Sequence, residues 1–235
     1  MTLIRTLLLA GASLSFASAA EARQLTFSGR TWDVKTSSGG LVGPGPNIFT
    51  DASSAIYVDA SGALHLTITR KQGKWLSTEI VGLQSLGYGT YRFDIAPGAT
   101  KIADNAVFGM FTYDLLPAEN YREVDIELSK WGDGRINNLQ CSVQPADAPD
   151  LYKQMAVAEN LKGWTMEFSW SPGNFGCKVT DQSTGSIVGT GQVTRGVPTP
   201  GNEKTRLNLW QFRGQAPIGN VASEVIVRSF TFVPM

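Results

Sequence analysis

The stretch Glu123-Val124-Asp125-Ile126-Glu127 places acidic and apolar residues in strict alternation. In an extended strand successive side chains point to opposite faces, so the three carboxylates share one face and the apolar residues share the other. The apolar face, which Leu128 extends, suits packing against a core. The acidic face crowds three like charges, which raise one another's pKa and oppose folding. The stretch therefore indicates a strand whose carboxylates have a functional role.

Cleavage of a glycosidic bond is the chemistry that suits such carboxylates. It uses one protonated and one ionised carboxyl group, about 5–5.5 Å apart when configuration is retained. Glu123 and Glu127 lie roughly 13–14 Å apart along a strand, so two long side chains must lean inward on a curved sheet. The shorter Asp125 can hydrogen-bond to a neighbour and hold the two glutamate pKa values apart. The alternative is an acidic strand face that is merely solvated.

Composition excludes several classes of partner. The chain has 235 residues, 42% of them apolar, with 20 Lys plus Arg and 20 Asp plus Glu. A nucleic-acid binder normally shows a basic excess and a lipid-surface binder a basic amphipathic helix, and this sequence has neither. We therefore expect a neutral polysaccharide as partner, no nucleic acid or membrane, and a monomer.

Residues 1–22 are predicted to be a secretory signal peptide, with cleavage near 19–22. Arg5 precedes the apolar stretch Leu7-Leu8-Leu9-Ala10, and small residues follow. A transmembrane anchor would need about 20 unbroken apolar residues, which this stretch does not supply. Residues 23–235 have no linker or repeat that would divide them, so we expect one secreted or periplasmic domain.

Cysteine and histidine are scarce. Cys141 and Cys177 can form a disulfide in an oxidising compartment, but we favour two buried small apolar side chains, because the sequence does not show whether their Cα atoms approach within about 7 Å. His65, the only histidine, is expected on an exposed strand face. The chain therefore has too few histidines and cysteines to favour a histidine-based triad or a zinc site, and we expect no cofactor.

Short strand-like runs recur between turn signals, which indicates an all-β sandwich or jelly roll. A helix is credible only around 151–161. The predicted strands cover residues 56–58, 64–69, 88–95, 107–113, 121–129, 136–143, 164–170, 175–180, 206–211 and 224–233.

Over roughly residues 24–235 the chain resembles glycoside hydrolase family 16, which contains lichenases, laminarinases and xyloglucan-active enzymes. The 123–127 stretch is similar to the family's catalytic strand in its unbulged form. Further similar motifs, in the family's order, are Thr78-Glu79-Ile80, Gly87-Tyr88-Gly89-Thr90-Tyr91, Phe111-Thr112-Tyr113, Phe168-Ser169-Trp170-Ser171-Pro172 and Leu207-Asn208-Leu209-Trp210. The resemblance implies a jelly-roll β-sandwich of two curved antiparallel sheets with a concave substrate groove.

The resemblance also implies residue roles. Glu123 would be the nucleophile, Glu127 the general acid/base and Asp125 the residue that tunes them. Substrate contacts are predicted for residues on the carboxylate face or in the matching groove motifs, with core or rim packing as the alternative for the aromatic ones; they are Tyr121, Trp131, Asn208, Trp210, Glu79 and Tyr113. Some family members hold a structural calcium, for which this sequence has no clear acidic cluster.

Departures from the family pattern concern the groove. Trp164 and Met166 stand where His and Tyr are usual, and Ile80 and Val81 follow Glu79 in place of Tyr-Arg. These positions lie outside the catalytic trio. We expect a secreted, retaining, endo-acting β-glycosidase that hydrolyses a β-glucan-type polysaccharide by double displacement. A transglycosylase on the same fold and a non-catalytic carbohydrate-binding sandwich are the alternatives.

Overall fold

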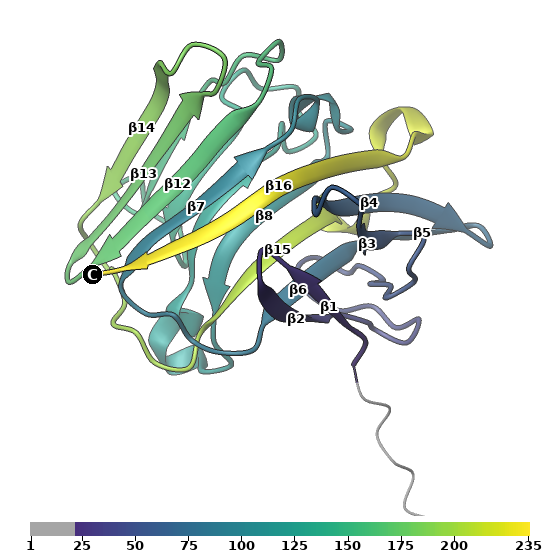
Figure 1. The fold of residues 1–235 in the computed structure, drawn as a ribbon, viewed down its shortest axis with the longest axis horizontal. Helices are drawn as coiled ribbons and strands as arrows, with labels where there is room; N and C mark the ends of the chain where they lie inside the picture. Colours follow the sequence, from purple (N-terminus) through teal and green to yellow (C-terminus); the bar gives the residue numbers. More distant parts are fainter. Residues whose placement is uncertain (1–21) are drawn as a thin grey trace, which may run out of the picture.

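The computed structural model describes residues 22–235, so the expected signal segment lies outside the described residues. Among residues 22–235, no helix is long and apolar enough to cross a membrane. The described chain forms two large antiparallel sheets stacked in two layers, which confirms the predicted all-β jelly-roll fold (Figure 1).

The first sheet carries the acidic strand near one end. Its strands, in spatial order, are β1 (Gln24–Phe27), β2 (Arg30–Val34), β6 (Thr78–Gly82), β15 (Lys204–Gln211), β8 (Ala106–Tyr113), β9 (Val124–Leu128), β10 (Leu139–Val143) and β11 (Tyr152–Met155).

The second sheet includes the long C-terminal strand, which runs across the front of Figure 1. Its strands, in spatial order, are β14 (Ile187–Val193), β13 (Asn174–Asp181), β12 (Trp164–Ser171), β7 (Gly89–Ile95), β16 (Ser223–Pro234), β4 (Leu64–Lys71) and β3 (Ile56–Val58), and β5 (Lys74–Leu76) pairs with β4. Four short 3₁₀ helices connect strands: η1 (Ala99–Lys101), η2 (Pro117–Arg122), η3 (Phe212–Gly214) and η4 (Ile218–Asn220).

The core fills the space between the sheets because each strand turns its apolar residues inward. Val124, Ile126 and Leu128 of β9 are buried there together with Leu207 and Leu209 of β15. Since alternate residues point to opposite faces, the polar residues between them lie on the outer face of the first sheet. This register places the carboxylates on the face of the sheet opposite the packed core.

Two predictions about elements are wrong. The segment 151–161 is not helical: Tyr152–Met155 forms the edge strand β11, paired with Leu139–Ser142 of β10. The acidic strand begins at Val124, not at residue 121, because Asn120, Tyr121 and Arg122 adopt left-handed backbone conformations at the end of η2. Strand alternation therefore does not govern the direction of the Tyr121 side chain.

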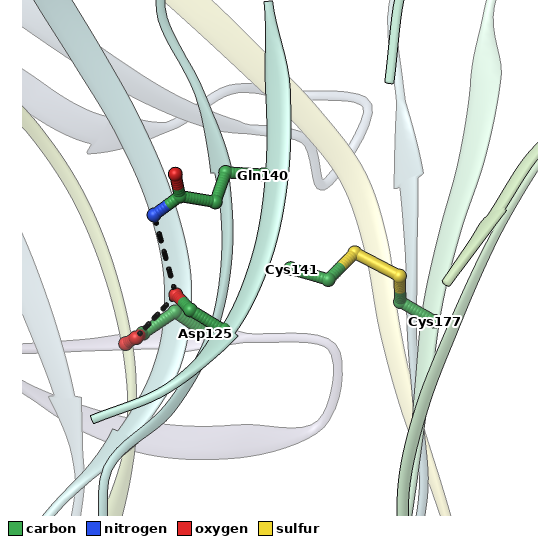
Figure 2. Close-up of a disulfide and its surroundings, with 5 residues drawn as sticks. Asp125, Gln140, Cys141 and Cys177 are labelled. Carbon is green, nitrogen blue, oxygen red and sulfur yellow. Dashed lines mark hydrogen bonds between the residues drawn. A yellow bond between two sulfur atoms is a disulfide. The ribbon is translucent and has the colours of Figure 1, made fainter. Parts of the chain in front are cut away.

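The two cysteines form a disulfide, contrary to the favoured prediction. Cys141 on β10 and Cys177 on β13 have Cα atoms 6.4 Å apart, and their bond joins the two sheets across the core (Figure 2). The sequence could not predict this pair, because the two strands lie in different sheets.

The expectation for His65 is also corrected, since its side chain is 12% exposed. Its ring stacks on Tyr57 at 4.5 Å, and its two nitrogens lie 2.8 Å from Glu224 and 3.2 Å from Asp59. The histidine therefore bridges two carboxylates on the outer face of the second sheet.

Candidate active site

Strand register brings the candidate residues into line across the first sheet. Asn208 on β15 faces Glu79 on β6 on one side and Gly109 on β8 on the other. Gly109 in turn faces Glu127 on β9, and Glu127 faces Gln140 on β10. Paired residues on adjacent strands point to the same face, so this row crosses the outer face at right angles to the strands.

A second row runs parallel to the first and is offset from it by two residues along each strand. Arg206 on β15 faces Phe111 on β8, which faces Asp125 on β9, which faces Ser142 on β10. The two rows together explain why residues far apart in the sequence meet at one site.

Asp125 is the most firmly held of the three carboxylates. It is 2% exposed, and its Oδ2 accepts hydrogen bonds from Ser142 Oγ at 3.1 Å and from Gln144 Nε2 at 2.8 Å. Gln140 Nε2 donates to Ser142 Oγ at 3.5 Å, and Figure 2 shows the resulting chain of hydrogen bonds from Gln140 to Asp125. Strand β10 therefore fixes the central carboxylate from one side.

Each of the three carboxyl groups has a raised pKa. Burial, and then the charges of Asp125 and Glu127, raise the pKa of Glu123, which is also hydrogen-bonded to Asp125. Burial and the charge of Asp125 raise the pKa of Glu127. Burial raises the pKa of Asp125 too, but the hydrogen bonds from Gln144 and Ser142 work against that rise. The cluster therefore holds protons that isolated carboxyl groups would lose, as general acid catalysis requires.

Glu79 lies at the other end of the site, held by basic and amide groups. Its side chain is fully buried and pairs with Lys35 Nζ at 2.9 Å and Arg206 Nη1 at 2.8 Å. Asn208 Nδ2 donates to the same carboxylate at 3.3 Å. A buried carboxylate needs such partners, because desolvation of an unpaired charge is costly.

Aromatic rings form one wall of the site. Tyr113 stacks on Tyr121 with ring centroids 5.0 Å apart, and the Arg206 guanidinium lies 4.8 Å from the Tyr113 centroid. The turn that presents Tyr121 is held by Arg122, whose guanidinium pairs with Asp114 at 2.6 Å. Consecutive left-handed non-glycine residues of this kind are costly and tend to occur at functional sites.

These groups surround one cavity of about 490 Å³. All the predicted site residues except Trp131 line it, namely Glu123, Asp125, Glu127, Tyr121, Asn208, Trp210, Glu79 and Tyr113. Trp131 lies beyond the end of β9 and packs edge-on against Phe212 at 5.2 Å. The prediction for Trp131 required the strand to run that far, but β9 ends at Leu128, so strand alternation does not set the direction of the Trp131 side chain.

The cavity also has lining residues that sequence reasoning missed: Lys35, Gly43, Pro44, Phe111, Leu115 and Arg206. Alternation could have found Arg206, which lies two residues before Asn208 on the same face of β15. Lys35 carried no such signal, because β2 was not predicted as a strand. Within residues 22–235, no group of three or more His, Cys, Asp or Glu side chains is arranged to hold a metal ion.

The fold matches that of several solved glucanase structures. The Bacillus licheniformis beta-glucanase shares 19% identity over 87% of this chain and 92% of its own, with a TM-score of 0.64. A GH16 protein of the Bacteroides ovatus mixed linkage glucan PUL, in complex with a G4G4G3G product, shares 15% identity over 86% and 94%, with a TM-score of 0.61.

A third match is described as a pseudo-glucanase, so the fold alone does not establish that a protein hydrolyses a glucan. An immunostimulatory antigen and pseudo beta-1,3-glucanase of Mycobacterium tuberculosis shares 16% identity over 87% of this chain and 91% of its own, with a TM-score of 0.63. No protein-family model and no curated protein matches the chain. At these identities the likeness shows the fold, and the activity must be argued from the site.

Proposed function

We propose that the protein is a secreted glycoside hydrolase of family 16 that cleaves internal bonds of a β-glucan-type polysaccharide with retention of configuration. The observation that carries this proposal is the placement of Glu123, Asp125 and Glu127 together in one cavity on the outer face of the first sheet. Three crowded, partly desolvated carboxyl groups oppose folding, and glycoside cleavage is a reaction that uses them.

In the first step Glu127 donates its proton to the glycosidic oxygen while the Glu123 carboxylate attacks the anomeric carbon. The bond to the leaving chain breaks, and an ester between Glu123 and the sugar forms. The raised pKa of Glu127 suits its role as the acid. Glu123 must be ionised to attack, and the neighbouring Asp125 can accept the proton that Glu123 holds in the free protein.

In the second step the ionised Glu127 takes a proton from water, and the water oxygen attacks the same carbon. The ester bond breaks, Glu123 leaves as a carboxylate, and the sugar regains its original configuration. Each step inverts the anomeric carbon, so the two steps together retain its configuration in the product.

An endo mode of action is supported by groups on both sides of the carboxylates. Glu79, Asn208 and Tyr113 lie toward β6, and Gln140 and Gln154 lie toward β11, where Gln154 Nε2 donates to Gln140 Oε1 at 2.9 Å. Export is supported by the disulfide, because structural disulfides persist in oxidising compartments.

The test is the release of reducing ends from barley β-glucan, laminarin, xyloglucan and agarose. We expect turnover of one polymer, formation of the β-anomer first by NMR, and loss of at least about a thousandfold in kcat with Glu123→Gln. The matched control is Glu159→Gln, an exposed glutamate outside the cavity, which should leave kcat unchanged. A folded Glu123→Gln variant with substantial activity would refute the assignment.

The same experiment separates the two alternatives. Elongated oligosaccharides formed from a short donor and acceptor would identify a transglycosylase, because the glycosyl ester then passes to another sugar. Oligosaccharide binding without turnover of any polymer would identify a carbohydrate-binding protein.

A further inference from the structure

The end of the cavity formed by β6 and β15 carries an unmatched positive charge. Lys35 and Arg206 both pair with the single carboxylate of Glu79, so one positive charge remains even when Glu79 is ionised. The two cationic side chains are 19% and 15% exposed, so water screens them only in part. Among the described residues, Glu79 is the one carboxylate that forms an ion pair with either cation, although the charge of Arg206 also lowers the pKa of Glu123. The two cations therefore leave room for a second anion at this end of the cavity.

Two buried polar atoms at this end have no hydrogen-bond partner. Arg206 Nε and Asn208 Oδ1 are among five such side-chain atoms in the described residues, and they alone of the five belong to the cavity lining. An unpaired buried donor or acceptor costs about 1–3 kcal/mol. The site thus offers one unpaired acceptor, Asn208 Oδ1, and an unpaired N–H donor at Arg206 Nε.

The guanidinium of Arg206 is already oriented for a ligand. Nη1 is fixed by Glu79, and the planar group lies over the Tyr113 ring. A guanidinium held in this way presents its remaining N–H groups in a fixed fork, which matches a carboxylate better than it matches a single hydroxyl.

This end lies away from the bond that would be cleaved. Arg206 is two strands from Asp125 and Glu79 is three strands from Glu127, which corresponds to roughly 10 and 14 Å across the sheet. An anion bound here does not take the place of the reacting sugar next to the catalytic carboxylates.

We propose that this end of the cavity binds a carboxylate carried by a sugar unit of the polysaccharide, so that a β-linked chain with acidic units is preferred over a neutral one. Arg206 receives the carboxylate, Lys35 adds to the attraction, and Asn208 Oδ1 accepts a hydrogen bond from a sugar hydroxyl. The proposal rests on the proposed function and specifies its substrate class. The balanced charge of the whole chain predicted a neutral partner, and the local charge distribution points to an acidic one.

The test measures binding, so that it does not depend on turnover. Three β-linked glucotetraoses are titrated into Glu123→Gln protein by calorimetry. One is neutral, one carries a glucuronate in place of the glucose at the non-reducing end, and one carries it at the reducing end. We expect one acidic isomer to bind at least about tenfold more tightly than the neutral one at low salt, with a difference that shrinks as salt screens the charge.

Matched variants assign the effect to this end of the cavity. Lys35→Gln should lower the preference for the acidic tetrasaccharide, whereas Lys74→Gln, the same change at an exposed lysine of β5, should leave it intact. Arg206→Lys keeps the charge but removes the fork, and it should also lower the preference. Circular dichroism of each variant verifies that it is folded.

The outcomes distinguish the two proposals. Equal or weaker binding of both acidic isomers, together with turnover of a neutral glucan by the wild-type protein, overturns the acidic substrate and leaves the glycosidase intact. Failure of all tetrasaccharides to bind, together with no turnover of any polymer, overturns both.

Discussion

Asp125 depends for its charge on two neutral donors, Ser142 of β10 and Gln144 just beyond the end of that strand. Because Ser142 and Gln144 hydrogen-bond to the ionised carboxylate, they favour ionisation and oppose the effect of burial. We predict that Gln144→Leu raises the pKa of Asp125 by about 1–2 units, the equivalent of a hydrogen bond to a charged group. The measurement is the ¹³C chemical shift of the Asp125 carboxyl as a function of pH.

The comparison for this prediction is Gln140→Leu, which removes an amide that reaches Asp125 only through Ser142. That variant should shift the titration of Asp125 less than Gln144→Leu does. Equal titration curves for wild-type and Gln144→Leu protein would show that the 2.8 Å contact does not tune the site.

His65 makes the stability of the protein depend on pH. Partial burial lowers its pKa, but the hydrogen bonds and charges of Glu224 and Asp59 outweigh that effect and raise the pKa above 6.5. A raised folded-state pKa contributes stability that is fully present below the unfolded pKa and is lost as pH rises through the folded value. His65→Gln should therefore cost more unfolding free energy at pH 6 than at pH 9, as measured by urea denaturation.

The pH dependence of this loss should disappear when the carboxylate partner is removed. In a Glu224→Gln background, we expect the cost of His65→Gln to differ less between the two pH values. A cost that is the same at both pH values in the wild-type background would mean that the ring stacks on Tyr57 without an electrostatic contribution.

Single residues were predictable where a pattern repeated. Alternation around Glu123, Asp125 and Glu127 indicated the acidic face, and the structure places all three in the cavity. Lys35, just past the end of β2, and Arg206 on β15 were missed because a lone basic residue cannot be distinguished in the sequence from any solvated side chain. Only the pairing of three strands reveals that both meet Glu79.

At the scale of elements, β8 separates Asn208 from Glu127 by a glycine. Gly109 lies between Asn208 and Glu127 in the register, and a Cβ on it would lie 2.6 Å from Asn208 Oδ1. We predict that Gly109→Ala displaces Asn208 and lowers kcat/KM for the polysaccharide by about tenfold or more, since small misplacements in a site are costly. Steady-state kinetics with a soluble glucan is the measurement.

The same steric clash should also lower the stability of the folded protein. Gly109→Ala should lower the melting temperature, and adding Asn208→Ala should recover part of that loss, because the shorter side chain leaves room for the new methyl group. Additive losses in the double variant would mean that the two positions do not compete for space.

Elements were predictable in proportion to their apolar periodicity. The central strands β7, β8, β12, β15 and β16 carry apolar residues at every second position, and the predicted runs overlap them closely. Edge strand β11 is half exposed and lacks that signal, so its apolar residues were taken for part of a helix. The start of β9 was missed because three left-handed residues before Glu123 are a backbone property that the side chains do not announce.

At the scale of the whole molecule, the disulfide between β10 and β13 restrains the separation of the two sheets. The cysteines are 36 residues apart, and a bond that closes a loop of this size stabilises a protein by about 2–4 kcal/mol through the unfolded chain. We predict a loss of this size when a reductant is added during guanidinium denaturation. The variant with Cys141→Ala and Cys177→Ala should lose similar stability and show no response to the reductant.

The topology of the whole chain was implied by the resemblance to a known family, whereas the cross-link was not. This disulfide requires β10 and β13, which lie in different layers, to come within reach of each other, and only the assembled sandwich contains that information. The position of Cys141 between Gln140 and Ser142 also means that the cross-link starts directly beneath the residues that hold Asp125 (Figure 2).

The bridge makes residues 141–177 a closed covalent ring that includes the exposed turn around Glu159. A protease that cuts the backbone once inside this ring opens it without releasing a fragment. The nicked protein would run as one band on a gel without reductant and as two bands with it. A surface turn beside the first sheet could thus be severed while every residue of the cavity stays tethered to the same molecule.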